Sequence, residues 1–137
     1  MKHTPIVQEM YAAFGRGDLP GLLKHLHADV DWAVNVDHTL PAAKPVGAWK
    51  PARGHAPVRD FFKHVSQDYE IHKFEPLSFL ETGNEVAVRL HMDSTVRPTG
   101  KKIVGELMHL FTFNDAGLVT RFREFADTLA EAQAWAR

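Results

Sequence analysis

The first part of the chain carries apolar side chains at the spacing of a helix face. Thr4 followed by Pro5 is typical of an N-cap and a first helical position, and Gly15 marks a helix end. The apolar positions between them are Ile6, Val7, Met10, Tyr11 and Phe14. The pattern predicts an amphipathic helix over about residues 4–15.

Two more helices and one strand are predicted before the middle of the chain. Asp18 can cap a short helix whose buried positions are Leu22, Leu23 and Leu26. Residues 30–34 alternate as a strand does, and the Pro/Gly-rich residues 35–54 are a candidate lid or pocket wall. A third helix begins near Pro57 and repeats apolar residues at Val58, Phe61, Phe62 and Val65.

The second half changes to the alternation of strands. Turn residues at 82–84, 98–100 and 114–117 separate four expected antiparallel strands, at about 71–81, 85–96, 102–113 and 118–126. Thr128 and Glu131 have the spacing of a capping box, which predicts a closing helix to about Trp135. The whole is an α+β fold, a curved antiparallel sheet over helices, and such a sheet leaves a cavity beside the helices.

Turn lengths predict which side chains face that cavity. If residues 114–117 form a four-residue turn, His109 opposes Phe122 and Leu107 opposes Glu124 across the last two strands. His109 and Glu124 then lie diagonally on one otherwise apolar face, and a bulge would invert this assignment. A four-residue turn at 97–100 adds the following residues to the same face: Val86, Val88, Leu90 and Met92.

A histidine and a glutamate on an apolar face have two interpretations. Loss of solvation raises the pKa of a buried carboxyl group, and such a pair can exchange protons near neutral pH. The alternative is a structural hydrogen bond without a catalytic role. The opposite face gathers Arg89, His91, Asp93 and Glu106, which is typical of a solvated or dimer-interface network rather than a substrate anchor.

Composition excludes several classes of protein. The 137 residues fit a single domain, 1–137, with a net charge of −1, so no basic surface for nucleic acid is expected. There is no cysteine, and the nine histidines lack metal-ligand spacing, so we expect neither a metal nor a cofactor. The chain starts directly with an amphipathic helix and has no long apolar run, which predicts a cytoplasmic protein without membrane contact.

Five segments together resemble the SnoaL-like polyketide cyclase group of the nuclear-transport-factor-two-like superfamily, which includes ketosteroid isomerase and limonene epoxide hydrolase. They are residues 11–18 (YAAFGRGD), 28–32 (ADVDW), 54–62, 108–117 (MHLFTFNDAG) and 123–127 (REFAD). The resemblance covers nearly the whole chain. It implies a cone of curved antiparallel sheet over three helices, a pocket between them, and a homodimer formed through the outer face of the sheet.

The resemblance also implies roles for single residues. His109 falls where ketosteroid isomerase has its oxyanion-hole aspartate, Tyr11 approximates the phenol donor of that enzyme, and Glu124 lies near a pocket acid of the cyclase branch. The position of the isomerase base is Val34 here, so steroid isomerisation is not expected. The side chains expected to contact a bound molecule are Trp32, Val34, Phe62, Val88 and Phe122.

These observations leave two hypotheses for the function. The first is a cofactor-independent acid–base enzyme that acts on a small apolar carbonyl or epoxide through His109, Glu124 and Tyr11, as an isomerase, cyclase, dehydratase or hydrolase. The second is a non-catalytic module of the same fold that binds a small molecule or dimerises.

Overall fold

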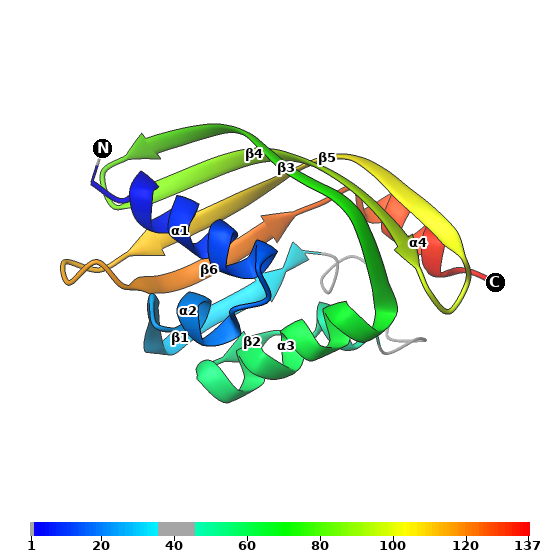
Figure 1. Cartoon of the computed structure of the whole chain (residues 1–137), viewed down its shortest axis with the longest axis horizontal. Coiled ribbons are helices and arrows are strands. Elements are labelled where there is room, and N and C mark those ends of the chain that lie inside the picture. The colour runs from blue at the N-terminus through cyan, green and yellow to red at the C-terminus, as the bar shows by residue number, and fades with distance from the viewer. Residues whose placement is uncertain (1, 36–45) are drawn as a thin grey trace.

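A six-stranded, strongly curved sheet wraps over three helices in the computed structural model, which describes residues 2–35 and 46–137 (Figure 1). The helices are α1 (Thr4–Gly15), α2 (Leu19–Leu23) and α3 (His55–Asp68), and α4 (Thr128–Trp135) closes the chain. The strands are β1 (Leu26–Val34), β2 (Ala52–Arg53), β3 (Tyr69–Thr82), β4 (Glu85–Val96), β5 (Lys101–Phe113) and β6 (Val119–Phe125). The predicted α+β class is confirmed.

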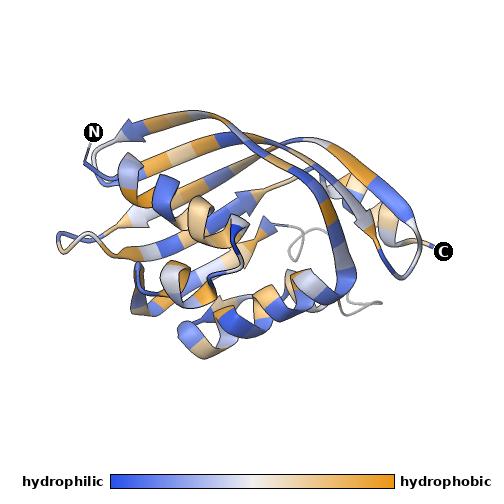
Figure 2. Cartoon of the chain, viewed as in Figure 1, coloured by the Kyte–Doolittle hydropathy of each residue, from blue (hydrophilic) through white to orange (hydrophobic). Residues whose placement is uncertain are grey.

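The sheet order is β2-β1-β6-β5-β4-β3, so the four long strands form the expected antiparallel meander. The strand predicted over residues 30–34 begins earlier, at Leu26, and pairs parallel with β6 at one side and antiparallel with β2 at the other. Alternating hydrophilic and hydrophobic residues run along the long strands, as expected for a sheet with one covered face (Figure 2). The concave face therefore points toward the helices.

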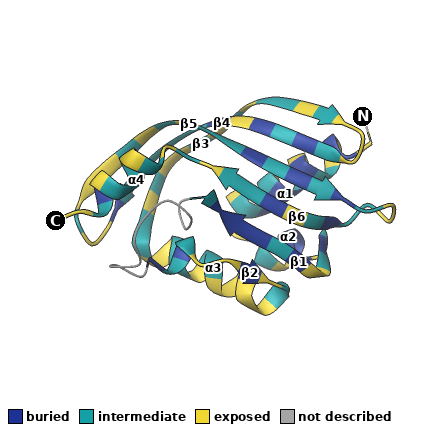
Figure 3. Cartoon of the chain, turned by 180° about the vertical axis from the view of Figure 1, so that it is seen from behind, coloured by how far each residue is buried: buried dark blue, intermediate teal, exposed yellow. Residues whose placement is uncertain are grey.

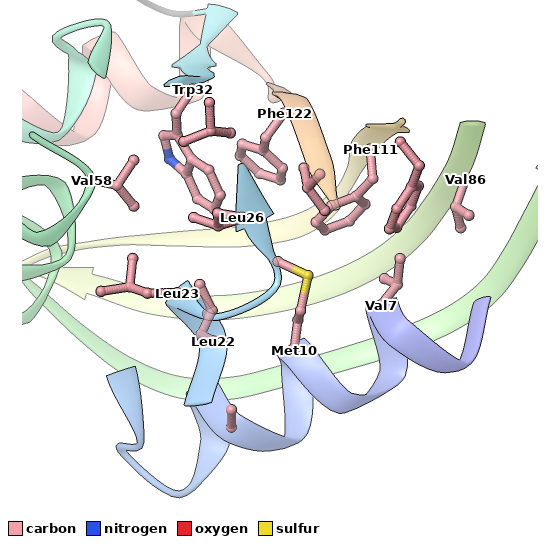
Figure 4. Close-up of a cluster of buried hydrophobic side chains, with 14 of the residues drawn as sticks. Val7, Met10, Leu22, Leu23, Leu26, Trp32, Val58, Val86, Phe111 and Phe122 are labelled. Atoms are coloured by element: carbon pink, nitrogen blue, oxygen red, sulfur yellow. The ribbon is translucent and has the colours of Figure 1, made fainter. Parts of the chain in front are cut away.

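The hydrophobic core lies between the concave face of the sheet and helices α1 and α2 (Figure 4). Val7 and Met10 of α1 meet Val86 and Phe111 of the sheet there, each nearly or fully buried. From behind, the C-terminal part of β1 is mostly buried while α3 carries exposed residues along its outer side (Figure 3). No helix in the described ranges combines the length and the apolarity that crossing a membrane requires.

The start of α1 differs from the sequence prediction, whereas the start of α2 agrees with it. Thr4 is the first residue of α1 rather than its N-cap, and Glu81 of β3 takes the capping role instead. The Glu81 carboxylate accepts hydrogen bonds from the Thr4 hydroxyl and from the backbone N–H groups of Lys2, His3 and Thr4. Asp18 caps α2 as predicted, because its side chain accepts from the Gly21 N–H at 2.9 Å.

Candidate active site

A cavity of about 220 Å³ lies between the concave face of the sheet and the helices. Helices α1 to α4 and five of the strands contribute to its walls, which are mostly aliphatic and aromatic. Its polar side chains include Tyr11, Ser94, His109, Glu124 and Glu131. An apolar cavity with a few polar groups is the usual form of a small-molecule site.

Three of these polar side chains form a continuous chain of hydrogen bonds. The Tyr11 hydroxyl lies 2.8 Å from Nδ1 of His109, and Nε2 of His109 lies 2.9 Å from Oε1 of Glu124. They come from α1, β5 and β6, so only the tertiary structure brings them together. The three residues predicted as catalytic are thus linked through His109.

The direction of these bonds follows from the chemistry of each group. A carboxylate only accepts, so beside ionised Glu124 the Nε2 atom of His109 must carry a proton. A neutral His109 then accepts the Tyr11 proton at Nδ1, whereas a protonated His109 donates to the Tyr11 oxygen. In the second state the Tyr11 proton is directed away from His109, toward a bound molecule. Both ring nitrogens are engaged in either state, so His109 connects the two outer groups.

Packing and burial fix the side chains of this hydrogen-bonded chain in position. His109 is 6% exposed, and both of its nitrogens need partners because a buried polar atom without one is costly. The Tyr11 ring packs edge-on against Phe74 and Phe111, with ring centres 5.4 and 5.9 Å apart. Burial and the negative charge of Glu124 hold the pKa of Tyr11 well above its usual value. Tyr11 therefore stays a neutral hydroxyl donor.

The predicted register of β5 and β6 is wrong by two residues. His109 pairs directly with Glu124, and Phe111 pairs with Phe122. The turn lets Phe113 pair with Val119 rather than Leu118, and a second irregularity follows between Phe113 and Thr112. Because two single-residue shifts restore the alternation, both side chains still share a face. The β4–β5 register agrees with the prediction along the whole hairpin, including Val88 beside His109.

The residues expected to contact a ligand divide into two groups. Trp32, Val34, Phe62 and Phe122 line the cavity, and Trp32 stacks on Phe122 with ring centres 4.0 Å apart. Val88 is fully buried in the hydrophobic core and lies outside the cavity lining. Of the candidate lid at 35–54, residues 36–45 lie outside the described part of the chain, whereas Ala48 and Trp49 of the short 3₁₀ helix η2 (Gly47–Trp49) line the cavity.

On the opposite face of the sheet, the residues predicted to form a network make two separate ion pairs, and His91 has no side-chain hydrogen bond or ion pair among the described residues. His91 pairs with Glu106 across β4 and β5, and Glu106 forms an ion pair with Arg89. Asp93 in turn binds Lys102, with 3.2 Å between Oδ1 and Nζ. Both ion pairs lie on the side of the sheet away from the helices.

Glu131 is a residue of the cavity that the sequence pattern does not reveal. Its spacing from Thr128 predicts a capping box, but the N-cap of α4 is Asp127, whose side chain accepts from the Ala130 N–H at 3.0 Å. Glu131 lies one position further along the helix, lines the cavity and accepts a hydrogen bond from Tyr69 at 3.1 Å. Only the position of α4 against the sheet reveals this, because the sequence around Glu131 is that of an ordinary helix start.

The comparisons with known proteins assign the family. The SnoaL-like domain matches residues 7–122, and the chain belongs to this family. The structure is similar to an NTF2-like protein of unknown function from Burkholderia pseudomallei K96243, at 27% identity, a TM-score of 0.85, and coverage of 100% of this chain and 99% of that one. It is also similar to an NTF2-like protein from Burkholderia xenovorans LB400, at 30% identity, a TM-score of 0.83, and coverage of 98% and 96%.

A third similar structure is that of a protein co-crystallised with a small molecule. TerC, co-crystallised with polyporic acid, is 25% identical, has a TM-score of 0.80, and each chain covers 98% of the other. No curated protein matches the chain significantly.

Proposed function

We propose that this protein is a cofactor-independent enzyme that moves protons on a small, largely apolar carbonyl compound. The observation that carries the proposal is the hydrogen-bonded chain from Tyr11 through His109 to Glu124, which faces an apolar cavity. Such a cavity excludes water and strengthens each electrostatic interaction inside it.

The atoms of Glu124 and Tyr11 that are available to a ligand determine the role of each side chain in the reaction. Among the described residues, the second carboxylate oxygen of Glu124 accepts no hydrogen bond, so it can take a proton from the carbon next to the carbonyl. The electron pair of that C–H bond moves to the carbonyl oxygen and forms an enolate. The Tyr11 hydroxyl donates to this oxygen, which stabilises the charge as it develops.

His109 acts through the other two residues and is a positioning residue. When it is protonated, Nδ1 donates to Tyr11 and Nε2 donates to Glu124, so the Tyr11 proton can turn to the ligand. The return of the proton from Glu124 to a different carbon gives isomerisation. Attack of the enolate carbon on a second carbonyl group of the same molecule gives cyclisation, and the alkoxide formed there takes the proton back from Glu124. Both reactions share the first step.

The likeness to TerC supports an aromatic ligand with carbonyl oxygens, because that protein was co-crystallised with polyporic acid, a diphenyl-substituted hydroxyquinone. The cavity offers aromatic rings that suit such a molecule, among them Trp32, Phe62 and Phe122.

The shared first step can be tested without knowing the natural substrate. We would follow by NMR the exchange of the protons next to the carbonyl of 1-tetralone in D₂O. We expect acceleration by the wild type and a loss of about 100-fold or more in Glu124→Gln, the usual contribution of a general base. Glu75→Gln, an exposed glutamate of β3, is the control. Equal exchange rates for the wild type and Glu124→Gln would contradict the proposal.

A further inference from the structure

A second polar group faces the cavity from α4, outside the Tyr11–His109–Glu124 chain. Glu131 Oε2 accepts from the Tyr69 hydroxyl at 3.1 Å, and Trp135 Nε1 donates to the same hydroxyl at 3.0 Å. An indole nitrogen only donates, so it occupies the Tyr69 oxygen as an acceptor and leaves the Tyr69 proton for Glu131. Oε2 of Glu131 is thereby fixed as an acceptor.

The other oxygen of Glu131, Oε1, has no hydrogen-bond partner within residues 2–35 and 46–137. The side chain lines the cavity and is only partly exposed. A ligand that fills the cavity displaces the water around this oxygen. The oxygen then needs a hydrogen-bond partner on the ligand, because a buried polar atom without a partner costs free energy.

We infer that Glu131 is a neutral carboxylic acid that donates a hydrogen bond from Oε1 to an acceptor oxygen of the bound molecule. This ligand oxygen is a second one, distinct from the carbonyl oxygen that Tyr11 binds. The inference rests on the proposed function for the contact between Tyr11 and the first oxygen. The ligand then carries two acceptor oxygens, as a quinone or a diketone does.

The charges around Glu131 support the neutral form. Burial, and then the negative charges of Glu124 on β6 and Asp127 at the helix start, raise its pKa to about 7, although the Tyr69 hydrogen bond opposes this. Tyr69 of β3 is itself neutral, because burial raises its pKa far above the usual value. From β5, Lys101 Nζ binds the carbonyl oxygens of Gln133 and Ala136, at the far end of α4.

The first experiment needs no ligand. We would titrate the glutamate side-chain carboxyl groups by ¹³C NMR in the wild type and in Glu131→Gln. The expected result is one glutamate that titrates near pH 7 in the wild type and is missing in the variant. Titration of Glu131 in the ordinary range of glutamate would overturn the inference, whether or not any probe binds.

The second experiment compares two bicyclic probes of similar size, 1,4-naphthoquinone, which has two acceptor oxygens, and 1-tetralone, which has one. The Glu131 variants control for the difference in ring saturation between them. Their affinities would be measured by NMR titration between about pH 5.5 and pH 8.5. We expect the wild type to favour the quinone about tenfold at the acid end and to lose this preference at the alkaline end, the scale of one hydrogen bond to a buried acid. Glu131→Gln keeps an N–H donor and should keep the preference at all pH values.

Glu131→Ala removes the donor and should abolish the preference throughout the pH range. A preference that survives unchanged in Glu131→Ala would show that Glu131 only supports Tyr69, and would overturn the inference. Binding selectivity does not require turnover. A protein that keeps the pH-dependent preference but does not exchange 1-tetralone protons would therefore contradict the proposed catalysis alone.

Discussion

His109 and Glu124 face each other directly across the β5–β6 pair, with 2.9 Å between Nε2 and Oε1. A diagonal arrangement would leave more separation between them, since diagonal neighbours on a sheet lie about 7–8 Å apart at their Cα atoms. The direct pairing lets one nitrogen of His109 reach Glu124 while the other reaches Tyr11. The imidazole thereby couples a carboxylate to a hydroxyl donor.

Removing the Tyr11 hydroxyl should affect exchange far more than folding. In Tyr11→Phe, we expect the exchange rate of 1-tetralone protons to fall about 100- to 1000-fold, the range seen for loss of an oxyanion donor. The ring contacts with Phe74 and Phe111 remain, so the loss of stability should be about 1–3 kcal/mol, the cost of leaving buried Nδ1 of His109 without its partner. NMR exchange and thermal unfolding by circular dichroism measure the two effects. An unchanged exchange rate would exclude Tyr11 as the donor.

The Glu81 cap should make stability depend on acid pH. Its hydrogen bonds, with the Thr4 hydroxyl as the largest contribution, lower the pKa of Glu81 from its usual 4.5 to about 2. A lowered folded-state pKa stabilises the protein above pH 4.5, and this contribution is lost as the pH falls toward 2.

The test is Glu81→Gln, followed by thermal unfolding at neutral and at acid pH. We expect a melting temperature several degrees below the wild type at neutral pH and a difference that shrinks toward pH 2. Glu75→Gln, which removes an exposed ion pair with Lys73, should have little effect at either pH. A constant difference between Glu81→Gln and the wild type at all pH values would show that the charge of Glu81 is not involved.

Gly105 should control the size of the cavity. It lies on β5 and lines the cavity, and no atom lies within 4 Å of the position that a Cβ would take. Gly105→Val should therefore fold without a clash, with stability unchanged or raised, because a β-branched residue suits a strand.

The same side chain should occupy part of the ligand space. We expect Gly105→Val to weaken the binding of 1,4-naphthoquinone about tenfold or more in an NMR titration, whereas Gly15→Ala should not weaken it. Gly15 also has free space around its Cβ position but lies outside the lining of this cavity. Equal affinities of Gly105→Val and the wild type would show that the probe binds elsewhere.

The outer face of the sheet should form the homodimer that the family resemblance implies. It exposes Leu80, Val104 and Phe125, which are 60%, 57% and 46% accessible. Light scattering coupled to size-exclusion chromatography should give a dimer for the wild type and a monomer for Val104→Asp, because a charge in an apolar interface loses its solvation. Leu129→Asp, at an exposed position of α4, is the control. A monomeric wild type would contradict this prediction.

The sequence by itself determined the elements and most of their faces. Alternation along the chain and the four-residue turn at 97–100 predicted β4 and β5 with the correct register. The turn length sets which residues pair, and a shift by one residue would turn the apolar side chains of the buried face toward solvent. Alternation also placed His109 and Glu124 on one face. Tyr11 entered through the family resemblance rather than through a local pattern.

Only the tertiary structure decided which polar groups meet. The β5–β6 register depends on a local irregularity between Thr112 and Phe113. Such an irregularity requires no particular residue type, so the sequence does not reveal it. The role of Glu131 depends on where α4 lies against Tyr69 and the cavity. A local sequence fixes the spacing of side chains on one element, whereas the site is made by contacts between residues up to 98 positions apart, such as Tyr11 and His109.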